Sequence, residues 1–412
     1  MYARTLNDRQ ERRGGVAESM ALALAGRLRR GRLTLHLHDG RSRVFEGPEA
    51  GPDAEIRVRR PRVFRRLLSS GELGLAAAYM DGDWESPDLT ALIALGAVNE
   101  EVLGQTLAGN LWGRIASRAL HALRPNSKRG SRRNIAAHYD LGNDFYAAWL
   151  DPGLTYSAGL FASAADDDLA AAQDRKYRRI ADLAGIEPGH HVLEIGCGWG
   201  GFCTWAAHEL GCRVTAITIS REQYDYSLAR VRAEGLEDRV ELRLQDYRDL
   251  DGVYDAIVSI EMLEAVGEAY WPTYFARLRE RLRPGGKAAL QVIVIDDGRA
   301  ESYRRSVDFI QRYIFPGGML PSPAALRRLT DDAGLRLTGW SRHGADYART
   351  LAAWRRRFDR AWPRIVAADA ERKFDERFRL MWRYYLAYCE VGFQVGRIDL
   401  MHLALQREAD GA

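Results

Sequence analysis

Residues 189–200 read Gly-His-His-Val-Leu-Glu-Ile-Gly-Cys-Gly-Trp-Gly, and a further glycine follows at position 201. The run 191–195 is too short and too apolar for a surface helix, so it predicts a buried strand. The glycines after it allow the backbone to approach a ligand without hindrance from side chains. Residues 202–210 then begin a helix whose free amide groups favour an anion. This order of strand, glycine turn and helix is typical of a loop that binds a nucleotide cofactor, although such a turn can also serve packing alone.

The same glycines leave two cofactor classes to compare. Gly196, Gly198 and Gly201 match the Gly-x-Gly-x-x-Gly pattern of dinucleotide-binding proteins. However, Glu194 places a carboxylate two residues before the first glycine, which is unfavourable beside a pyrophosphate but suits the methionine ammonium group of S-adenosylmethionine. The second predicted strand, residues 213–219, also lacks the terminal acidic residue that a dinucleotide ribose usually requires. The sequence therefore predicts S-adenosylmethionine as the cofactor.

Length and composition indicate a globular protein of two domains. The 412 residues exceed one hydrophobic core, and the net charge is only +4. No apolar run approaches the roughly 18–20 residues that span a bilayer. The four cysteines follow neither a zinc-finger spacing nor a secreted disulfide framework: Cys197, Cys203, Cys212 and Cys389. We therefore expect no metal site, a cytoplasmic location and at most peripheral contact with a membrane.

The N-terminal region, residues 1–120, predicts a small α+β domain with an accessory or lipid-binding role. Residues 33–37 and 41–45 alternate like two strands of a hairpin around an Asp-Gly turn, and residues 54–58 predict a third strand. Helical patterns follow these strands. The region shows no cluster of catalytic residue types, which indicates binding or a structural role.

A basic linker is expected at residues 121–133. It contains five basic residues, interrupted by proline and glycine: Arg124, Lys128, Arg129, Arg132 and Arg133. They form either a solvated hinge or a site that attracts anionic lipid headgroups. In the second case each basic residue near the charged surface contributes about 1 kcal/mol of binding free energy. Nucleic acid would be attracted in the same way, but no recognition motif accompanies the charge, so no nucleic-acid partner is expected.

Residues 134–412 predict the larger domain. Apolar strands alternate there with amphipathic helices, which is typical of a parallel sheet covered on both faces. Strands are expected at residues 191–195, 213–219, 239–244, 254–260, 287–295, 335–341 and 397–404. The segment 301–326 is longer than such a fold requires, so it predicts a helical lid over the substrate. The expected fold is an α/β, Rossmann-like class I methyltransferase domain with seven strands, preceded by the small α+β domain.

Six motifs occur in order along the chain. Besides the glycine loop they are His-Tyr-Asp-Leu-Gly-Asn-Asp-Phe-Tyr at 138–146, Leu-Thr-Tyr-Ser at 154–157, Glu-Ala-Val-Gly at 264–267, Tyr-Ile-Phe-Pro-Gly-Gly at 313–318 and Tyr-Cys-Glu at 388–390. This set resembles the motifs of the cyclopropane-fatty-acyl-phospholipid synthase family, whose relatives include the mycolic acid cyclopropane synthases. The resemblance covers residues 134–405 and extends weakly into residues 30–100.

The resemblance implies an enzyme in which S-adenosylmethionine donates a methyl group to the double bond of an acyl chain in a phospholipid. A proton then leaves and a cyclopropane ring closes. Because an alkene is a poor nucleophile, the enzyme must hold it against the methyl group in a dry pocket. Aromatic faces suit the carbocation, and the candidates, each of which could instead belong to the core, are Tyr139, Phe145, Tyr313 and Phe315.

The resemblance also implies a cofactor site. Together with Glu194, contacts to S-adenosylmethionine are expected from Tyr156, Ser157, Gly196, Gly198, Thr218, Gln223, Asp246 and Tyr247. Asp246 follows the third predicted strand, where its carboxylate could accept from the adenine amino group. Alternatively, it caps the next helix. Tyr247 is expected to pack on the adenine face.

A bound bicarbonate accepts the proton in the family, held by a glutamate, a histidine, a tyrosine and main-chain amides. The resemblance places Glu264 and Tyr347 as the glutamate and the tyrosine, and Ala158 and Ile293 as the main-chain contributors. Gln291 stands where the family has the histidine. Glutamine donates a hydrogen bond to bicarbonate but cannot carry the proton charge. Glu264 could otherwise be only a carboxylate at the start of a helix.

Other activities stay open at this point. Because glutamine replaces the histidine, methylation without ring closure is the main alternative, giving a methyl-branched or further-processed acyl chain; methylation of another small molecule is a second. A nucleic-acid methyltransferase is disfavoured because residues 259–262 read Ser-Ile-Glu-Met where an Asn-Pro-Pro-Tyr motif would stand. The glycine loop disfavours a non-catalytic lipid-binding protein. The oligomeric state is undecided, with a homodimer among the states considered.

Overall fold

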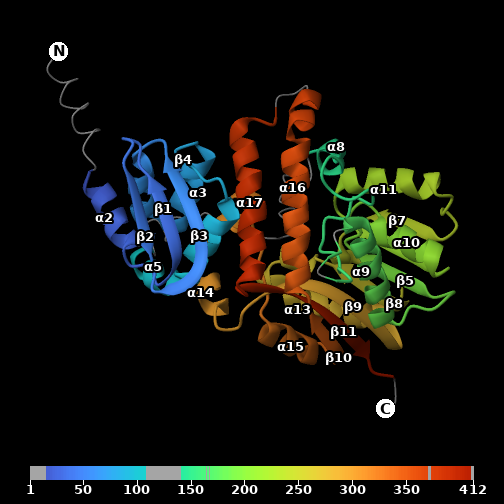
Figure 1. The fold of residues 1–412 in the computed structure, drawn as a ribbon. Coiled ribbons are helices and arrows are strands. Elements are labelled where there is room, and N and C mark those ends of the chain that lie inside the picture. The colour runs from blue at the N-terminus through green and yellow to red at the C-terminus, as the bar shows by residue number, and fades with distance from the viewer. Residues whose placement is uncertain (1–14, 108–140, 164, 167, 370–372, 410–412) are drawn as a thin grey trace. The chain divides into compact units, whose positions relative to one another are not determined.

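The computed structural model describes residues 15–107, 141–163, 165–166, 168–369 and 373–409 (Figure 1). The chain divides into two compact units. Unit 1 combines Met1–Leu120 with Arg305–Phe309 and Trp362–Val395, and unit 2 combines His121–Arg304, Ile310–Ala361 and Gly396–Ala412. Two predictions, Tyr139 as a substrate residue and the basic linker at 121–133, lie outside the described residues.

Unit 1 contains a four-stranded sheet in the order β2-β1-β3-β4. Its strands are β1 Arg30–His36, β2 Ser42–Glu46, β3 Glu49–Val58 and β4 Trp84–Glu85. β1 and β2 form the predicted antiparallel hairpin, with Leu33 opposite Phe45, and Gly40 supplies the left-handed turn with φ +88. β3 lies parallel to β1 and antiparallel to β4. The three strands predicted from the sequence are therefore confirmed.

Five helices accompany this sheet in the described residues: α2 Val16–Ala25, α3 Arg62–Met80, α4 Leu89–Val98, α5 Glu100–Leu107 and α17 Glu376–Gln394. α3 has a kink at Gly71, where φ is +56. α17 packs against α3 and α4, although the division based on sequence placed it in the methyltransferase domain. Tyr384 shows the reason, because its side chain is 2% exposed and its ring centre lies 5.8 Å from that of Tyr79 in α3.

Unit 2 contains a seven-stranded sheet in the order β10-β11-β9-β8-β5-β6-β7. The strands are β5 His191–Ile195, β6 Arg213–Thr218, β7 Val240–Leu244, β8 Tyr254–Ile260, β9 Leu282–Ile295, β10 Leu335–Arg342 and β11 Ile398–Arg407. Strands β5 to β9 run parallel, whereas β11 is antiparallel to β9 and to β10. All seven predicted strands are confirmed. β9 begins before its predicted start because Leu282 already pairs with Tyr254 of β8.

Helices cover both faces of this sheet, as Figure 1 shows. Alternate side chains of β5 serve the two layers: Val192 packs in one apolar cluster and Leu193 in the other. The first cluster includes side chains of α9 Leu169–Ala184, α10 Gly201–Glu209 and α11 Arg221–Ala233; the second includes side chains of α13 Trp271–Arg281 and α15 Pro323–Asp332. The predicted α/β class is therefore confirmed.

The strand order places a topological switch point at the carboxyl ends of β5 and β8, and this edge of the sheet is called the crevice below. β5 pairs with β6 on one side and with β8 on the other. The connection that follows β5 therefore runs to one side of the sheet, toward β6, and the connection that follows β8 runs to the other side, toward β9. Ligands of open α/β sheets bind at such a point. The crevice is where the functional residues should be sought.

The segment predicted as a lid contains two short helices. They are α14 Ala300–Arg304 and the π-helix Ile310–Ile314. The segment returns beside the short helix α12 Leu263–Val266, since Met319 N donates to Glu264 O at 2.9 Å. Its function as a lid stays a prediction. Among the described residues, no helix is long and apolar enough to cross a membrane.

Candidate active site

The glycine turn lies between β5 and α10, at the crevice. Gly196, Gly198 and Gly200 have φ values of +86, +54 and +80, a conformation that favours glycine. A Cβ atom added at Gly198 would meet no protein atom within 4 Å. The space beside Gly198 is therefore open to a ligand, and the main chain can approach that ligand closely.

Glu194 lies in β5, two residues before the turn, and is 3% exposed. Burial raises the pKa of its carboxyl group to about 8, against the opposing effects of Cys203 and Lys176. Within the described residues, Glu194 Oε2 has no hydrogen-bond partner. A buried carboxylate with an unused oxygen suits a cationic group, so this site fits the methionine ammonium group of S-adenosylmethionine.

Two further predicted cofactor residues contact each other at the end of β6. Thr218 Oγ1 donates to Gln223 Oε1 at 2.9 Å, and both residues are 6% exposed. Gln223 is held in the first turn of α11, where Ser220 caps the helix. The pair lies near the glycine turn, because Gly196 N donates to Ile217 O at 3.0 Å. The structure thus brings these predicted residues to one edge of the sheet.

Asp246 follows β7 and is 2% exposed. Its carboxylate accepts the main-chain N–H of Arg248 at 3.0 Å and the guanidinium of the same residue at 2.7 and 2.8 Å. The capping alternative is therefore present, at the start of the short 3₁₀ helix Tyr247–Asp249. The buried ring of Tyr247 packs edge-on against Tyr274, with 5.4 Å between ring centres. Contacts of Asp246 and Tyr247 with adenine stay predictions.

A buried lysine that no motif identifies lies beside Ser157. Lys176 Nζ donates to Ser157 Oγ at 2.8 Å, and Lys176 is 0% exposed. Tyr156, the other predicted cofactor residue here, packs its ring 5.3 Å from that of Trp354. Burial lowers the pKa of Lys176 to about 8, and three carboxylates limit the shift: those of Glu261, Asp151 and Glu194. The lysine thus couples the cofactor site electrostatically to Glu261.

Three hydrogen bonds converge on the carboxylate of Glu261, directly after β8. Oε1 accepts from Ala158 N at 2.9 Å and from Gln291 Nε2 at 2.7 Å, and Oε2 accepts from the Tyr347 hydroxyl at 2.6 Å. Glu261 has φ +50, which is unfavourable for a residue with a Cβ atom. Such strained residues cluster at functional sites. Burial raises the pKa of Glu261 above its ordinary value despite the three donors.

Glu264, the glutamate that the resemblance placed at the bicarbonate site, contacts a main-chain group of β9, and its role at that site stays a prediction. It lies in α12 Leu263–Val266 and accepts the main-chain N–H of Ile293. Tyr347 and Ala158, its predicted companions around an anion, donate to Glu261 instead. The reason is the strand register, because β8 ends with Ile260 opposite Gln291 of β9 and so delivers residue 261 to this point.

The carboxylate of Glu264 is also buried, and the charge of the Glu261 carboxylate acts on it. Glu264 Oε2 has no hydrogen-bond partner within the described part of the chain. Burial, together with the charge of Glu261, raises the pKa of Glu264 to about 8. Motif comparison missed Glu261, although a carboxylate directly after a strand of a parallel sheet lies at the edge where ligands bind. That position is the signal that could have identified it.

Gln291 is held between two strands. It is 0% exposed, its Nε2 also donates to Ala158 O at 3.3 Å, and its Oε1 accepts from His402 Nε2 at 2.8 Å. His402 lies opposite it on β11. Because an amide oxygen only accepts, this pattern assigns the ring hydrogen to His402 Nε2, and burial lowers the pKa of His402 so that the ring is neutral. The amide NH₂ group of Gln291 is thereby directed to Glu261.

The aromatic candidates separate into one core residue and two partly exposed residues. Phe145, in α8 Asn143–Ala147, is 3% exposed and packs against Trp149 and Phe358, with ring centres 5.9 and 6.3 Å away. It therefore belongs to the core, which was the alternative for each candidate. Tyr313 and Phe315 are partly exposed in and after the π-helix. These two stay candidates for the substrate pocket.

The four cysteines are free. Burial raises the pKa of Cys197 and Cys203 well above the usual range, so both are uncharged thiols. In the part of the chain that the structure describes, no group of three or more His, Cys, Asp or Glu residues could hold a metal ion.

Known proteins resemble this chain over most of its length. The family model described as mycolic acid cyclopropane synthetase matches residues 126–403. The tuberculostearic acid methyltransferase UfaA1 of Mycobacterium tuberculosis is 40% identical over 421 aligned residues, covering 96% of this chain and 93% of the relative. The cyclopropane-fatty-acyl-phospholipid synthase of Escherichia coli K12 is 38% identical over 356 residues, covering 86% and 88%. The crystal structure of mycolic acid cyclopropane synthase CmaA1 complexed with SAH and CTAB has 27% identity and a TM-score of 0.62, covering 67% of this chain and 98% of its own.

Proposed function

Because the chain belongs to the mycolic acid cyclopropane synthetase family and is an S-adenosylmethionine-dependent C-methyltransferase, we propose that it adds one carbon to the double bond of an unsaturated acyl chain in a phospholipid, giving a cyclopropane fatty acyl chain. S-adenosylmethionine supplies an electrophilic methyl group when it is bound. The glycine turn, Glu194 and the Thr218–Gln223 pair hold it at the carboxyl end of the sheet. Ser157 and Tyr156 contribute from the preceding loop.

The convergence of three donors on Glu261 carries this proposal. Ala158 N, the Tyr347 hydroxyl and the Gln291 amide are groups that the family resemblance assigned to bicarbonate, and all three are bonded to a side-chain carboxylate. We assign Glu261 as the proton acceptor in place of bicarbonate. Its raised pKa makes it a stronger base than a carboxylate in water, and the donors keep it in position.

Ring closure requires one proton to leave the transferred carbon. The electron pair of the double bond forms the new bond to the methyl carbon as that carbon separates from sulfur, and the neighbouring acyl carbon becomes a cation. Glu261 then takes a proton from the methyl carbon, and the electron pair of that C–H bond closes the ring. Glu261 is neutral after this step and returns the proton to solvent before the next turnover.

Glu264 serves as a positioning residue in this scheme. It holds the main chain at Ile293, two residues from Gln291, and so fixes the strand that directs an amide to Glu261. With a pKa of about 8 it is largely protonated at neutral pH. The crevice therefore does not place two like charges side by side.

Methylation without ring closure is the second candidate, and two observations favour it. The acceptor is a side chain fixed by three donors, so the ring closes only if the methyl carbon faces Glu261. Proton loss from a neighbouring carbon would instead give a methylated alkene. In addition, the UfaA1 relative is named a tuberculostearic acid methyltransferase.

Access to the substrate requires contact with a membrane, because the acyl chain belongs to a phospholipid. We assign this contact to the N-terminal region, residues 1–120, and to the basic linker at 121–133, as a peripheral association on the cytoplasmic side. Five basic residues in the linker support the assignment, since each adds attraction to an anionic surface.

The test uses the purified full chain, S-adenosylmethionine and vesicles of a monounsaturated phospholipid, in buffer freed of carbon dioxide. Mass spectrometry and NMR identify the product. A cyclopropane formed without added bicarbonate supports the proposal. If the product is a methylated alkene and no cyclopropane forms, the second candidate is the function. If product forms only when bicarbonate is added, Glu261 is not the proton acceptor.

A further inference from the structure

Unit 1 contains a hollow of about 640 Å³ whose lining is rich in arginine. Two acidic residues, Glu85 and Glu376, line it together with five basic ones: Arg57, Arg59, Arg60, Arg379 and Arg383. The lining therefore has an excess of three positive charges. Every lining residue belongs to unit 1, and none belongs to the crevice described above.

One wall of the hollow comes from the end of β3. Arg57 and Arg59 alternate with Val58, whose side chain is 5% exposed in the core, so the two arginines project from the opposite face of the strand. Asp83 O accepts from the main-chain N–H groups of Arg59 and Arg60 at 2.8 and 3.0 Å. The main chain that carries these arginines is therefore held against β4.

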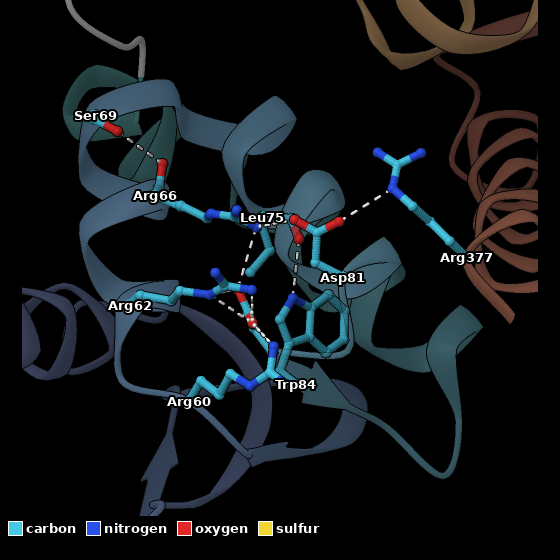
Figure 2. Close-up of polar contacts among 9 residues, drawn as sticks. Arg60, Arg62, Arg66, Ser69, Leu75, Asp81, Trp84 and Arg377 are labelled. Carbon is cyan, nitrogen blue, oxygen red and sulfur yellow. Dashed lines mark hydrogen bonds and ion pairs between the residues drawn. The ribbon is translucent and has the colours of Figure 1, made fainter.

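A buried carboxylate supports this wall from behind. Asp83 is 0% exposed, and Arg62, Arg66 and Arg60 approach its oxygens at 2.7, 3.2 and 3.5 Å (Figure 2). Asp81 pairs with Arg66 at 2.7 Å and with Arg377 at 3.1 Å. The two aspartates thus bind mainly arginines that do not line the hollow. Three lining arginines have carboxylate partners of their own: Arg57 pairs with Glu55 at 2.6 Å, Arg59 with Glu85 at 2.5 Å and Arg379 with Glu376 at 3.2 Å. Over the whole network, the five lining arginines together with Arg62, Arg66 and Arg377 make eight positive charges, and they face five carboxylates, so an excess of three positive charges remains: Glu55, Asp81, Asp83, Glu85 and Glu376.

The opposite wall is one face of α17. Glu376, Arg379, Leu380 and Arg383 are spaced by three and four residues, so they project from the same side of the helix. Arg379 bonds Glu376 through one terminal nitrogen, at 3.2 and 3.3 Å. Its Nε atom is buried and has no hydrogen-bond partner among the described residues. A donor group is therefore available beside the hollow.

Aromatic rings complete the lining. Trp84 and Tyr79 are each 2% exposed, and their ring centres are 4.8 Å apart. Trp84 Nε1 donates to Leu75 O at 2.9 Å, which fixes the indole (Figure 2). With Leu380 and Pro87 they give an apolar surface next to the arginines. A ligand for this hollow should carry an anion joined to an apolar part.

We propose that the hollow binds the phosphate group of an anionic phospholipid. Arginine forks bind phosphate oxygens in pairs, and the apolar surface receives the glycerol and the first carbons of the chains. The volume and the aromatic surface distinguish this site from one for a free phosphate ion. The inference rests on the proposed function for the class of lipid, and it assigns the headgroup to unit 1.

The test measures binding of dihexanoyl phosphatidylglycerol, below its micelle concentration, to the full chain by calorimetry. The site variant combines Arg59→Gln with Arg379→Gln. The control combines Arg27→Gln with Arg43→Gln, two exposed arginines of the same unit outside the hollow, so both proteins lose the same charge. We expect the site variant to bind roughly tenfold more weakly or worse, and the control to stay within about twofold of the parent.

Three results would overturn the proposal: equal losses in the two variants, inorganic phosphate binding as tightly as the lipid, or a dihexanoyl galactolipid without phosphate binding as tightly. An unchanged unfolding transition of unit 1 in both variants, measured by differential scanning calorimetry, shows that they are folded. Because binding is measured without turnover, a chain that binds the lipid at the hollow but forms no product contradicts the proposed function and supports this site. A chain that forms product while the site variant binds normally contradicts this site alone.

Discussion

Glu261 owes its role to the position of a single residue at the end of β8. The side chain at this point meets a main-chain amide, a phenol and an amide side chain from three separate segments. Three residues later, the side chain of Glu264 accepts a hydrogen bond only from the main chain of Ile293 among its described partners. Two glutamates of the same short segment thus receive different environments, and only one has the hydrogen bonds expected of a held proton acceptor.

Replacing Glu261 tests this assignment. Glu261→Gln keeps the shape but removes the base, so we expect kcat to fall by about 10²–10⁴-fold, the range that general-base catalysis supplies. The affinity for S-adenosylmethionine should change much less than kcat in calorimetric titration, because Glu261 reaches the predicted cofactor contacts only through the charge of Lys176. Glu237→Gln, an exposed site, is the matched control. If Glu264→Gln loses all activity while Glu261→Gln retains it, the two roles must be exchanged.

The pH dependence of cofactor binding follows from Glu194. Its pKa of about 8 lies above the ordinary value for glutamate, so the free protein holds a proton there at neutral pH. Binding an ammonium group requires the charged form. Affinity for S-adenosylmethionine should therefore fall as the pH drops below 8, approaching tenfold per pH unit. Calorimetric titration between pH 6 and 8 measures this, and Glu194→Gln should bind weakly with a flat profile. A steep profile in that variant would assign the proton to another group.

At the scale of elements, the turn between β5 and α10 combines two conditions. Its glycines have left-handed main-chain conformations, and Gly198 faces space that the protein does not fill. Both conditions also hold at Gly235, in the turn between α11 and β7, where φ is +66 and an added Cβ again meets nothing within 4 Å. The two glycines differ in location, because Gly198 lies at the crevice and Gly235 lies in the turn before β7. They can therefore be compared as a matched pair.

Gly198→Val should abolish cofactor binding without unfolding the sheet, because the new side chain fills space that the cofactor needs. The backbone strain of a left-handed β-branched residue costs about 1–2 kcal/mol in both Gly198→Val and Gly235→Val. Thermal unfolding should therefore shift similarly in the two variants, while calorimetric titration shows loss of S-adenosylmethionine binding in the first only. Unchanged affinity in a folded Gly198→Val protein would refute the assignment of the turn.

At the scale of the whole molecule, the division into units does not follow the order of the chain. Unit 1 recruits α17 from near the C-terminus, and Tyr384 packs between Tyr79 and Phe309, with ring centres 5.8 and 4.7 Å away. Removal of the N-terminal region would leave this buried face of α17 without its partners. Substitutions inside unit 1 therefore examine its role more cleanly than truncation does.

Tyr384→Ala should destabilise unit 1 by about 3 kcal/mol, the lower end of the cost of removing a buried aromatic ring. The predicted contacts to S-adenosylmethionine all lie in unit 2, so the cofactor should raise the unfolding temperature of that unit in the variant as in the parent. Differential scanning calorimetry with and without cofactor separates the two transitions. Val366→Ala, at a side chain 43% exposed in the same unit, should cost no more than about 0.5 kcal/mol. A lowered cofactor-dependent transition in Tyr384→Ala would show that the units unfold together.

The sequence by itself determined the class of fold and the cofactor loop. Strands in a parallel sheet are continuous apolar runs, and left-handed turns need glycine, so both features are local and can be recognised without the fold. The five parallel strands of unit 2 were predicted for the first reason and the glycine turn after β5 for the second. The order of the motifs likewise indicated the family, because each motif is a short run of neighbouring residues and can be recognised without the fold.

Only the tertiary structure decided which carboxylate receives the donors of the acceptor site. Ala158, Gln291 and Tyr347 are distant in sequence, and their meeting point depends on strand register and on the path of two loops. The same holds for the pairing of His402 with Gln291 across β11 and β9, and for α17 in unit 1. Hydrogen-bond partners and buried faces between distant segments depend on packing, and packing is a property of the folded chain that local patterns do not encode.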